Sequence, residues 1–136
     1  MAEGKVLTGA GLRGQVAGKT ALSTVGKSGA GLTYRGYDVQ DLAENCQFEE
    51  VAYLIFFGEL PTAAQLTAYK AKLKSLRQLP QALKEVLERI PADSHPMDVM
   101  RTGVSMLGNL ETEQSFAEQQ DAADRILATL PAIICY

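Results

Sequence analysis

The chain has 136 residues, of which 46% are hydrophobic and 21% are charged, and its formal net charge is −3. This composition is typical of a globular protein of one domain, and the net negative charge gives no electrostatic reason to bind nucleic acid. The longest apolar stretch is far shorter than the ~20 residues of a membrane span, and the N-terminus lacks a secretory signal, so we expect a cytoplasmic protein with no membrane partner.

Residues 1–18 are rich in glycine and lack periodicity, which predicts an irregular arm ahead of a helical domain over 19–136. The arm contains GAGLRG at 9–14, which matches the dinucleotide-binding pattern G-x-G-x-x-G. That pattern requires a helix directly after the loop, whereas the following residues have no helical period and Gly18 interrupts them. We therefore expect no dinucleotide site.

Two short runs rich in Thr, Val, Leu and Tyr flank a glycine-rich turn over residues 19–36, which predicts a β-hairpin or a small sheet. The segment ALSTVGKS at 21–28 is close to a phosphate-binding loop, but Ala21 stands where the first glycine belongs. The residues after it cannot easily begin the helix that would cap a phosphate. A hairpin turn is the favoured interpretation.

Two helices are predicted next. Asp38 can cap a short helix that starts near residue 39, and Asp41 adds negative charge to its first turn. Residues 48–57 are apolar nearly all round and are followed by Gly58, which indicates a buried helix that ends at a glycine cap.

The segment after Pro61 predicts a long helix and then a shorter one. Residues 62–65 have the Thr-x-x-Gln form of a capping box, and the helix they open places Leu66, Tyr69, Leu73 and Leu76 on one core-facing stripe. A neighbouring row of Lys70, Lys74 and Arg77 is expected to be a solvated face. Pro80 suits the first turn of the shorter helix, whose apolar positions continue to Ile90 before Pro91.

His95 is the sole histidine of the chain and a candidate acid–base group. Pro96 belongs at a first helical position, which would place His95 at the N-cap and Asp98 at the third helical position. The spacing therefore favours a helix-entry role. Residues 95–109 carry little polar surface, which predicts a helix that is covered on most sides. Gly103 and Gly108 would let a neighbouring backbone come close.

A helical pattern resumes from about residue 116 and runs to Tyr136, with Pro131 expected to bend it near Leu127. The sequence stops inside an apolar run without a cap. We therefore expect either the N-terminal part of a longer protein or a tail that is buried against a partner.

Cys46 and Cys135 lie far apart and far from a C-x-x-C spacing, so we expect two reduced cysteines rather than a disulfide. Two cysteines and a distant histidine cannot assemble a zinc site without carboxylates, and no spacing positions those. The sequence predicts no metal site.

Two long motifs resemble the citrate synthase family. They are GLTYRGYDVQDLAENCQFEEVAYLIFFGELP at 31–61 and SHPMDVMRTGVSMLG at 94–108. Together with the segment QVAGKTALSTVGKSG, these two motifs are most similar in sequence to the bacterial 2-methylcitrate synthases of that family. The resemblance extends from about Gly14 to Tyr136.

The resemblance implies a mainly α-helical, multi-helical large-domain portion with a small N-terminal β-hairpin. It implies an acyltransferase that condenses propionyl-CoA with oxaloacetate and water, giving 2-methylcitrate and CoA in propionate catabolism, with no cofactor besides these substrates. The α-proton of a thioester is weakly acidic, so a base and an oxyanion stabiliser must act together. The family's catalytic histidines and aspartate lie beyond residue 136, so we assign no catalytic residue here and expect this chain alone to be inactive.

The resemblance further implies a homodimer formed through the helices at 95–109 and 116–136. The interface candidates are His95, Met97, Met100, Gly103, Val104, Leu107, Ile126, Leu130 and Ile133. Lys72 and Lys74 are the candidates for contact with an anionic substrate group. Two alternatives stay open, namely a citrate synthase that uses acetyl-CoA and a non-enzymatic helical dimerisation module.

Overall fold

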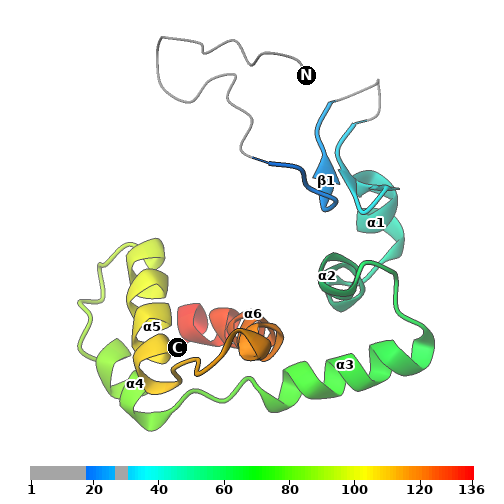
Figure 1. Ribbon diagram of the computed structural model, residues 1–136. Helices are drawn as coiled ribbons and strands as arrows, with labels where there is room; N and C mark the ends of the chain where they lie inside the picture. The colour runs from blue at the N-terminus through cyan, green and yellow to red at the C-terminus, as the bar shows by residue number, and fades with distance from the viewer. Residues whose placement is uncertain (1–17, 27–30) are drawn as a thin grey trace, which may run out of the picture.

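The computed structural model describes residues 18–26 and 31–136, and this part of the chain is mainly α-helical (Figure 1). The predicted arm lies outside the described residues apart from Gly18, and so does the GAGLRG segment at 9–14. The described elements are a small antiparallel sheet, six α-helices and one short 3-10 helix. The predicted fold class is confirmed.

The sheet contains three two-residue strands in the order β1 (Ser23–Thr24), β2 (Thr33–Tyr34) and β3 (Tyr37–Asp38). The predicted hairpin is therefore present, with a third strand added. The two-residue turn between β2 and β3 has positive φ at Arg35 and Gly36, 49° and 94°, as a tight hairpin turn requires. The Arg35 side chain then donates from Nη2 to the carbonyl oxygen of Ile55 at 2.9 Å, which ties the turn to the next part of the chain.

Helix α1 (Val39–Asn45) begins at the predicted residue, and helix α2 (Phe48–Phe57) begins and ends as predicted. The Gln40 amide donates to Asp38 Oδ1 at 2.8 Å, and Gly58 closes α2 at a φ of 91°. The prediction that α2 is buried all round is wrong for the described chain, because Leu54 is buried whereas Phe48 is 64% exposed. The physical reason is that α2 packs mainly against the next helix, which leaves its other side uncovered.

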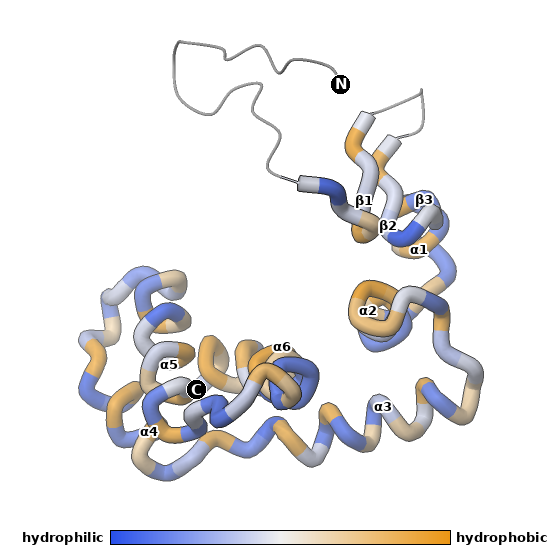
Figure 2. The backbone as a smooth tube through the Cα atoms, in the orientation of Figure 1, coloured by the Kyte–Doolittle hydropathy of each residue, from blue (hydrophilic) through white to orange (hydrophobic). Residues whose placement is uncertain are grey.

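Helix α3 (Ala63–Ser75) is opened by the predicted capping box. The Gln65 amide donates to Thr62 Oγ1 at 3.3 Å, and the Thr62 amide donates to Gln65 Oε1 at 2.8 Å. Figure 2 shows hydrophobic and hydrophilic residues alternating along α3, and the predicted stripe supplies the buried residues Tyr69 and Leu73. In Figure 1, α3 runs as a long bar that joins the sheet, α1 and α2 to the remaining helices.

Helix α4 (Gln81–Leu87) is shorter than predicted at both ends. Pro80 is its N-cap rather than part of its first turn, and the backbone leaves the helix at Glu88, before Ile90. Leu83 and Leu87 nevertheless face the core as the periodicity indicated, and both are buried.

Helix α5 (Pro96–Leu110) and helix α6 (Gln119–Cys135) complete the fold, with the 3-10 turn η1 (Phe116–Glu118) between them. Leu83, Leu87, Leu107 and Ile133 form one core cluster from α4, α5 and α6, and Tyr69, Leu73 and Ala128 form another between α3 and α6. Helix α6 continues through Pro131. Among the described residues, no helix is both long and apolar enough to span a bilayer.

The two glycines of α5 differ in their surroundings. A Cβ atom built on Gly103 would lie 2.5 Å from Ile133 Cγ2, so the Ile133 side chain of α6 packs closely against this glycine. A Cβ atom on Gly108 would meet nothing within 4 Å in the described chain. The prediction that α5 is covered on most sides is wrong for this chain, because the side that carries Gly108 and Met97 is exposed.

Candidate functional site

His95 is the N-cap of helix α5 and lies on the exposed surface of the described chain. Its Nδ1 accepts a hydrogen bond of 3.2 Å from the Met97 amide, which is the predicted N-cap arrangement, and Pro96 follows at the first helical position. Asp98 and Arg101 pair with each other at 2.9 Å on the exposed surface. His95 therefore serves the start of the helix, and the helix-entry interpretation is confirmed.

A buried polar network joins α3 to α6. Asp124 is fully buried, and its Oδ1 accepts from the Tyr69 hydroxyl at 2.8 Å. Its Oδ2 accepts from Lys72 Nζ at 2.7 Å, and Gln120 lies 3.3 Å from Oδ1. A buried carboxylate is tolerated only when its oxygens are paired in this way. The network therefore fixes where α6 lies against α3.

The same network shifts two pKa values upward. Burial raises the pKa of Tyr69, and the hydrogen bond to the Asp124 carboxylate adds to this effect. The pKa of Lys72 is raised by its hydrogen bonds to Asp121, at 2.8 Å, and to Asp124. Both shifts favour the protonated, hydrogen-bonding forms of the two side chains.

The two lysine candidates for substrate contact differ in their surroundings. The Lys72 ammonium already contacts two carboxylates, whereas Lys74, two residues further along α3, is exposed and is not part of that network. The basic row of Lys70, Lys74 and Arg77 is predicted to be a solvated face. In the structure, Lys70 donates a hydrogen bond to the Gln47 side-chain oxygen, and Arg77 Nη2 lies 4.0 Å from Glu49 Oε1. Substrate contact by Lys72 or Lys74 stays a prediction.

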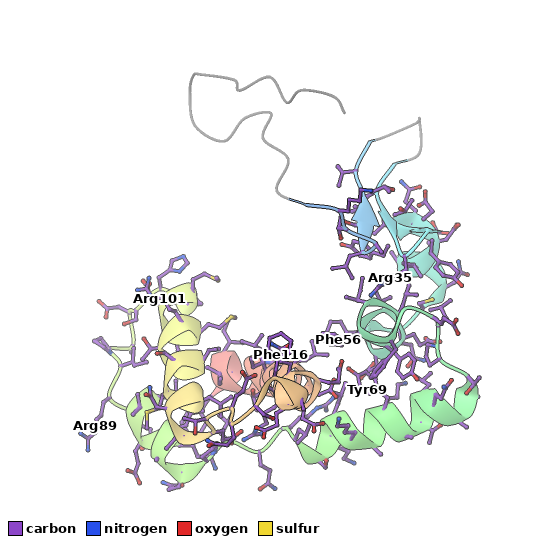
Figure 3. The ribbon with its side chains drawn as sticks, viewed as in Figure 1. Arg35, Phe56, Tyr69, Arg89, Arg101 and Phe116 are labelled. Atoms are coloured by element: carbon purple, nitrogen blue, oxygen red, sulfur yellow. The ribbon has the colours of Figure 1, made fainter. Side chains whose placement is uncertain are left out.

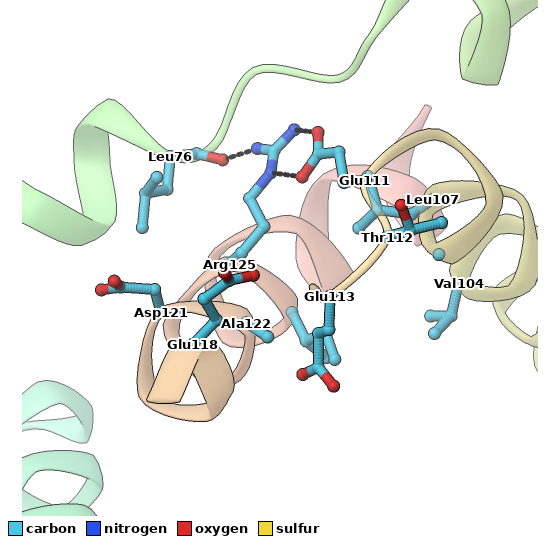
Figure 4. Close-up of a pocket in the computed structure, with 12 residues that line it drawn as sticks. Leu76, Val104, Leu107, Glu111, Thr112, Glu113, Glu118, Asp121, Ala122 and Arg125 are labelled. Carbon is cyan, nitrogen blue, oxygen red and sulfur yellow. Dashed lines mark hydrogen bonds and ion pairs between the residues drawn. The ribbon is translucent and has the colours of Figure 1, made fainter. Parts of the chain in front are cut away.

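Arg125 holds together three separate segments of the chain (Figure 4). Its guanidinium forms a bidentate pair with Glu111, at 2.8 Å from Nε and 2.6 Å from Nη2. Its Nη1 donates to the carbonyl oxygens of Leu76 and Gln78, the latter at 3.0 Å. Arg125 lowers the pKa of Glu111 through this hydrogen bond. We call these contacts the Arg125 clasp.

An open hollow of about 690 Å³ lies beside the Arg125 clasp, between α5, α6 and the connection that joins them. Its floor is apolar, and four carboxylates lie along its walls. The lining residues are Leu76, Val104, Leu107, Gly108, Glu111, Thr112, Glu113, Glu118, Asp121, Ala122, Arg125 and Ile126.

The chemistry of the hollow is that of a binding surface. Its lining combines carboxylates, one arginine already paired with Glu111 and apolar side chains, and neither His95 nor a cysteine belongs to that lining. Within residues 18–26 and 31–136, no group of three or more His, Cys, Asp and Glu side chains is arranged to hold a metal ion. The arrangement can receive an apolar group flanked by a positive charge.

The nine interface candidates divide into two sets. Gly103, Leu107 and Ile133 are buried in the core of this chain. The other six reach the surface to different extents: Met97 is 60% exposed and Ile126 is 40% exposed, His95 is exposed, and Met100, Val104 and Leu130 are half-buried. Of the nine candidates, these six are therefore the ones that still reach the surface of this chain.

The sequence did not reveal Asp124, Glu111 or Arg125 as important. A signal for Asp124 exists in its spacing, because it lies four residues before Ala128 on the stripe that α6 buries. A carboxylate on a buried stripe requires a partner, and that requirement points to a polar network. Arg125 and Glu111 carry no comparable signal, since Glu111 suits the solvated end of a helix and Arg125 suits a solvated helix face.

Comparison with known proteins places the chain in a family. The family model described as citrate synthase, C-terminal domain, matches residues 11–136. A 2-methylcitrate synthase of Shewanella oneidensis is 77% identical over the whole chain, and the match covers 36% of that protein. A citrate synthase of Mycolicibacterium smegmatis is 44% identical over 91% of the chain, and the match covers 34% of that protein.

Solved structures agree with this placement. A citrate synthase of Thermoplasma acidophilum, in a ternary complex with carboxymethyl coenzyme A and oxaloacetate, matches 90% of this chain with a TM-score of 0.81 and 27% identity. This chain spans 33% of that structure. From the match of the family model over most of its length, we conclude that the chain belongs to the citrate synthase family.

Proposed function

We propose that the full-length protein containing this chain is a 2-methylcitrate synthase of the cytoplasm. It condenses propionyl-CoA with oxaloacetate and water, and it releases 2-methylcitrate and CoA without a further cofactor. The observation that carries this proposal is the 77% identity, over the whole chain, to the Shewanella oneidensis protein of that name.

Within this proposal, residues 1–136 supply structure rather than proton transfer. Removal of the α-proton of a thioester needs a base and an oxyanion stabiliser that converge on one substrate. His95 is committed to a helix start, and the carboxylates of the Asp124 network and of the Arg125 clasp are paired with cations. We therefore place the acid–base groups beyond residue 136.

A second candidate is a citrate synthase that uses acetyl-CoA, and the Mycolicibacterium smegmatis relative of that name favours it. One experiment separates the two candidates. CoA release by the purified full-length protein is followed with oxaloacetate and either propionyl-CoA or acetyl-CoA, and the product is identified by mass. A larger kcat/KM for propionyl-CoA supports the proposal, and a larger value for acetyl-CoA supports the second candidate. If the protein released CoA from neither propionyl-CoA nor acetyl-CoA, both candidates would be contradicted.

We also propose that the protein is a homodimer formed through the exposed parts of α5 and α6. Exposed apolar side chains such as Met97 and Ile126 favour a partner, because subunit interfaces cover residues of this kind. Sedimentation velocity on the full-length protein is expected to show a dimer or a larger species. A monomer that persists at high concentration would contradict this part of the proposal.

A further inference from the structure

Two kinds of contact join α3 to α6. The apolar contact is made by Leu73 and the ring of Tyr69 on α3 and by Ala128 on α6. The polar contact is the Asp124 network, in which Asp124 accepts hydrogen bonds from the Tyr69 hydroxyl and from Lys72. Apolar contacts have no preferred direction, whereas hydrogen bonds require particular atoms to meet. The two kinds of contact therefore constrain the helices differently.

The apolar contact alone does not distinguish two placements of α6. Ala132 follows Ala128 by four residues, which is about one helical turn, so a shift of α6 by one turn puts alanine where alanine was. The apolar surface of α6 continues beyond Ala128, because Pro131 and Ala132 line an open groove of about 410 Å³ together with Leu73 of α3. The shifted placement therefore keeps an apolar contact with α3.

The Asp124 network distinguishes the two placements. After a shift of one turn, Ala128 would occupy the place of Asp124 opposite α3. The Tyr69 hydroxyl would then have no acceptor and little access to water. Tyr69 is 5% exposed, and its ring packs edge-on against Tyr53 and Phe57 of α2, towards which it is directed in Figure 3. A buried polar group without a partner is unfavourable, so the network disfavours the shifted placement.

The Arg125 clasp also joins α6 to α3, but water replaces its contacts when they break. The Glu111 side chain is 39% exposed, and Gln78, whose carbonyl oxygen accepts from Arg125, is exposed as well. The Arg125 side chain is long and has many rotamers, so it accommodates movement of its own helix. Asp124, by contrast, is fully buried. The network therefore discriminates between the two placements more strongly than the clasp does.

We propose that the Asp124 network selects one placement of α6 on α3 and lowers the stability of the protein in doing so. Burial removes a carboxylate from water, and its new hydrogen bonds recover only part of that loss. Apolar side chains of similar shape avoid the loss, but apolar packing alone specifies a unique arrangement less well. The network therefore contributes specificity of packing rather than stability.

Replacing the whole network in the full-length protein tests this role. The apolar variant carries Tyr69→Phe, Lys72→Met and Asp124→Leu, and leucine branches at the same carbon as aspartate. Its urea midpoint should equal or exceed that of the wild type. Lys72→Met alone should lower the midpoint, because it leaves Asp124 buried without its cation. A midpoint of the apolar variant clearly below that of the wild type would overturn the proposal.

Spin labels report the placement of α6 directly. They are attached through Lys74→Cys on α3 and Gln119→Cys on α6, two exposed positions outside the network, after other accessible cysteines are replaced by serine. An excess of unlabelled protein restricts the measured distances to those within one chain. The wild type should give one distance, and the apolar variant should add a second that differs by up to about 5 Å, the rise of one helical turn. One unchanged distance in the apolar variant would overturn the proposal.

Two further variants complete the test. Arg125→Met breaks the clasp and should lower the urea midpoint while keeping one distance; a second distance there would overturn the assignment of specificity to the network. Tyr69→Phe combined with Asp124→Leu keeps Lys72, which is partly exposed and can turn to water, and serves if the apolar variant does not fold. Two distances in this double variant support the proposal, and one distance overturns it. Neither readout uses the catalysed reaction, so failure here leaves the proposed function standing.

Discussion

The two glycines of α5 allow one chemical change to be tested in two environments. Gly103→Ala and Gly108→Ala each add one methyl group to the same helix, and each gains roughly 0.5–1 kcal/mol because alanine loses less backbone entropy than glycine. At Gly108 the added carbon meets nothing within 4 Å in the described chain. Gly108→Ala should therefore stabilise the fold by about that amount.

At Gly103 the added carbon would lie 2.5 Å from Ile133 Cγ2 and 3.4 Å from a methyl carbon of Leu87. Ile133 is 1% exposed and branched at Cβ, so it cannot turn aside freely. Overpacking of this kind costs roughly 2–3 kcal/mol, and subtracting the helix gain leaves Gly103→Ala less stable than the wild type by about 1–2 kcal/mol. The helix gain cancels when the two variants are compared, so they should differ by about 2–3 kcal/mol.

Urea unfolding followed by circular dichroism measures this difference. The protein should be kept at concentrations too low for subunit association, because dimerisation adds its own stability. Adding Ile133→Leu removes the methyl group nearest to Gly103 and should restore part of the loss in a double-mutant cycle. Equal stabilities of the two alanine variants would refute the close packing of α5 on α6 at Gly103.

Further predictions concern the Asp124 network and the start of α5. Lys72→Met leaves the buried Asp124 carboxylate without its cation and should destabilise the protein by about 2 kcal/mol, a value that allows for the partly exposed lysine. Lys74→Met is the control and should change the urea midpoint little, because Lys74 is exposed. Equal effects of the two substitutions would contradict the network. Because the pKa of Tyr69 is raised above 10.0 and that of Lys72 above 10.5, their stabilising contribution is complete below about pH 10 and is lost as the pH rises further. Tyr69→Phe should make the alkaline fall of the urea midpoint less steep, and an unchanged slope would argue against this origin. His95→Ala removes the side-chain acceptor of the N-cap and should lower the free energy of unfolding by about 1 kcal/mol. His95→Asn keeps an acceptor and should lower it much less. Similar losses for the two variants would contradict the capping role.

The elements that the sequence predicted well depend on neighbours in the chain. The capping box of Thr62 and Gln65, the N-caps of Asp38 and His95 and the glycine end at Gly58 each involve residues within a few positions, so spacing alone identifies them. The length of α4 was overestimated because apolar periodicity continues to Ile90, whereas the backbone turns after Leu87.

The parts that could not be predicted depend on contacts between distant residues. Lys72 and Asp124 are 52 positions apart, and Arg125 reaches a carbonyl oxygen 49 positions away. No local spacing reveals such pairs, and for that reason neither the ion pair of Lys72 with Asp124 nor the contacts of Arg125 were predicted. The exposure of α2 and α5 was misjudged for a related reason, since an apolar pattern shows that a helix face needs cover but not which segment covers it.

The central claim is that residues 1–136 provide helical structure and a subunit surface, while the acid–base chemistry lies elsewhere in the protein. Its most direct test is CoA release from propionyl-CoA and oxaloacetate, measured for the 136-residue chain and for the full-length protein side by side. We predict turnover by the full-length protein and none above the uncatalysed rate for the chain alone. Turnover by the chain alone would contradict the account.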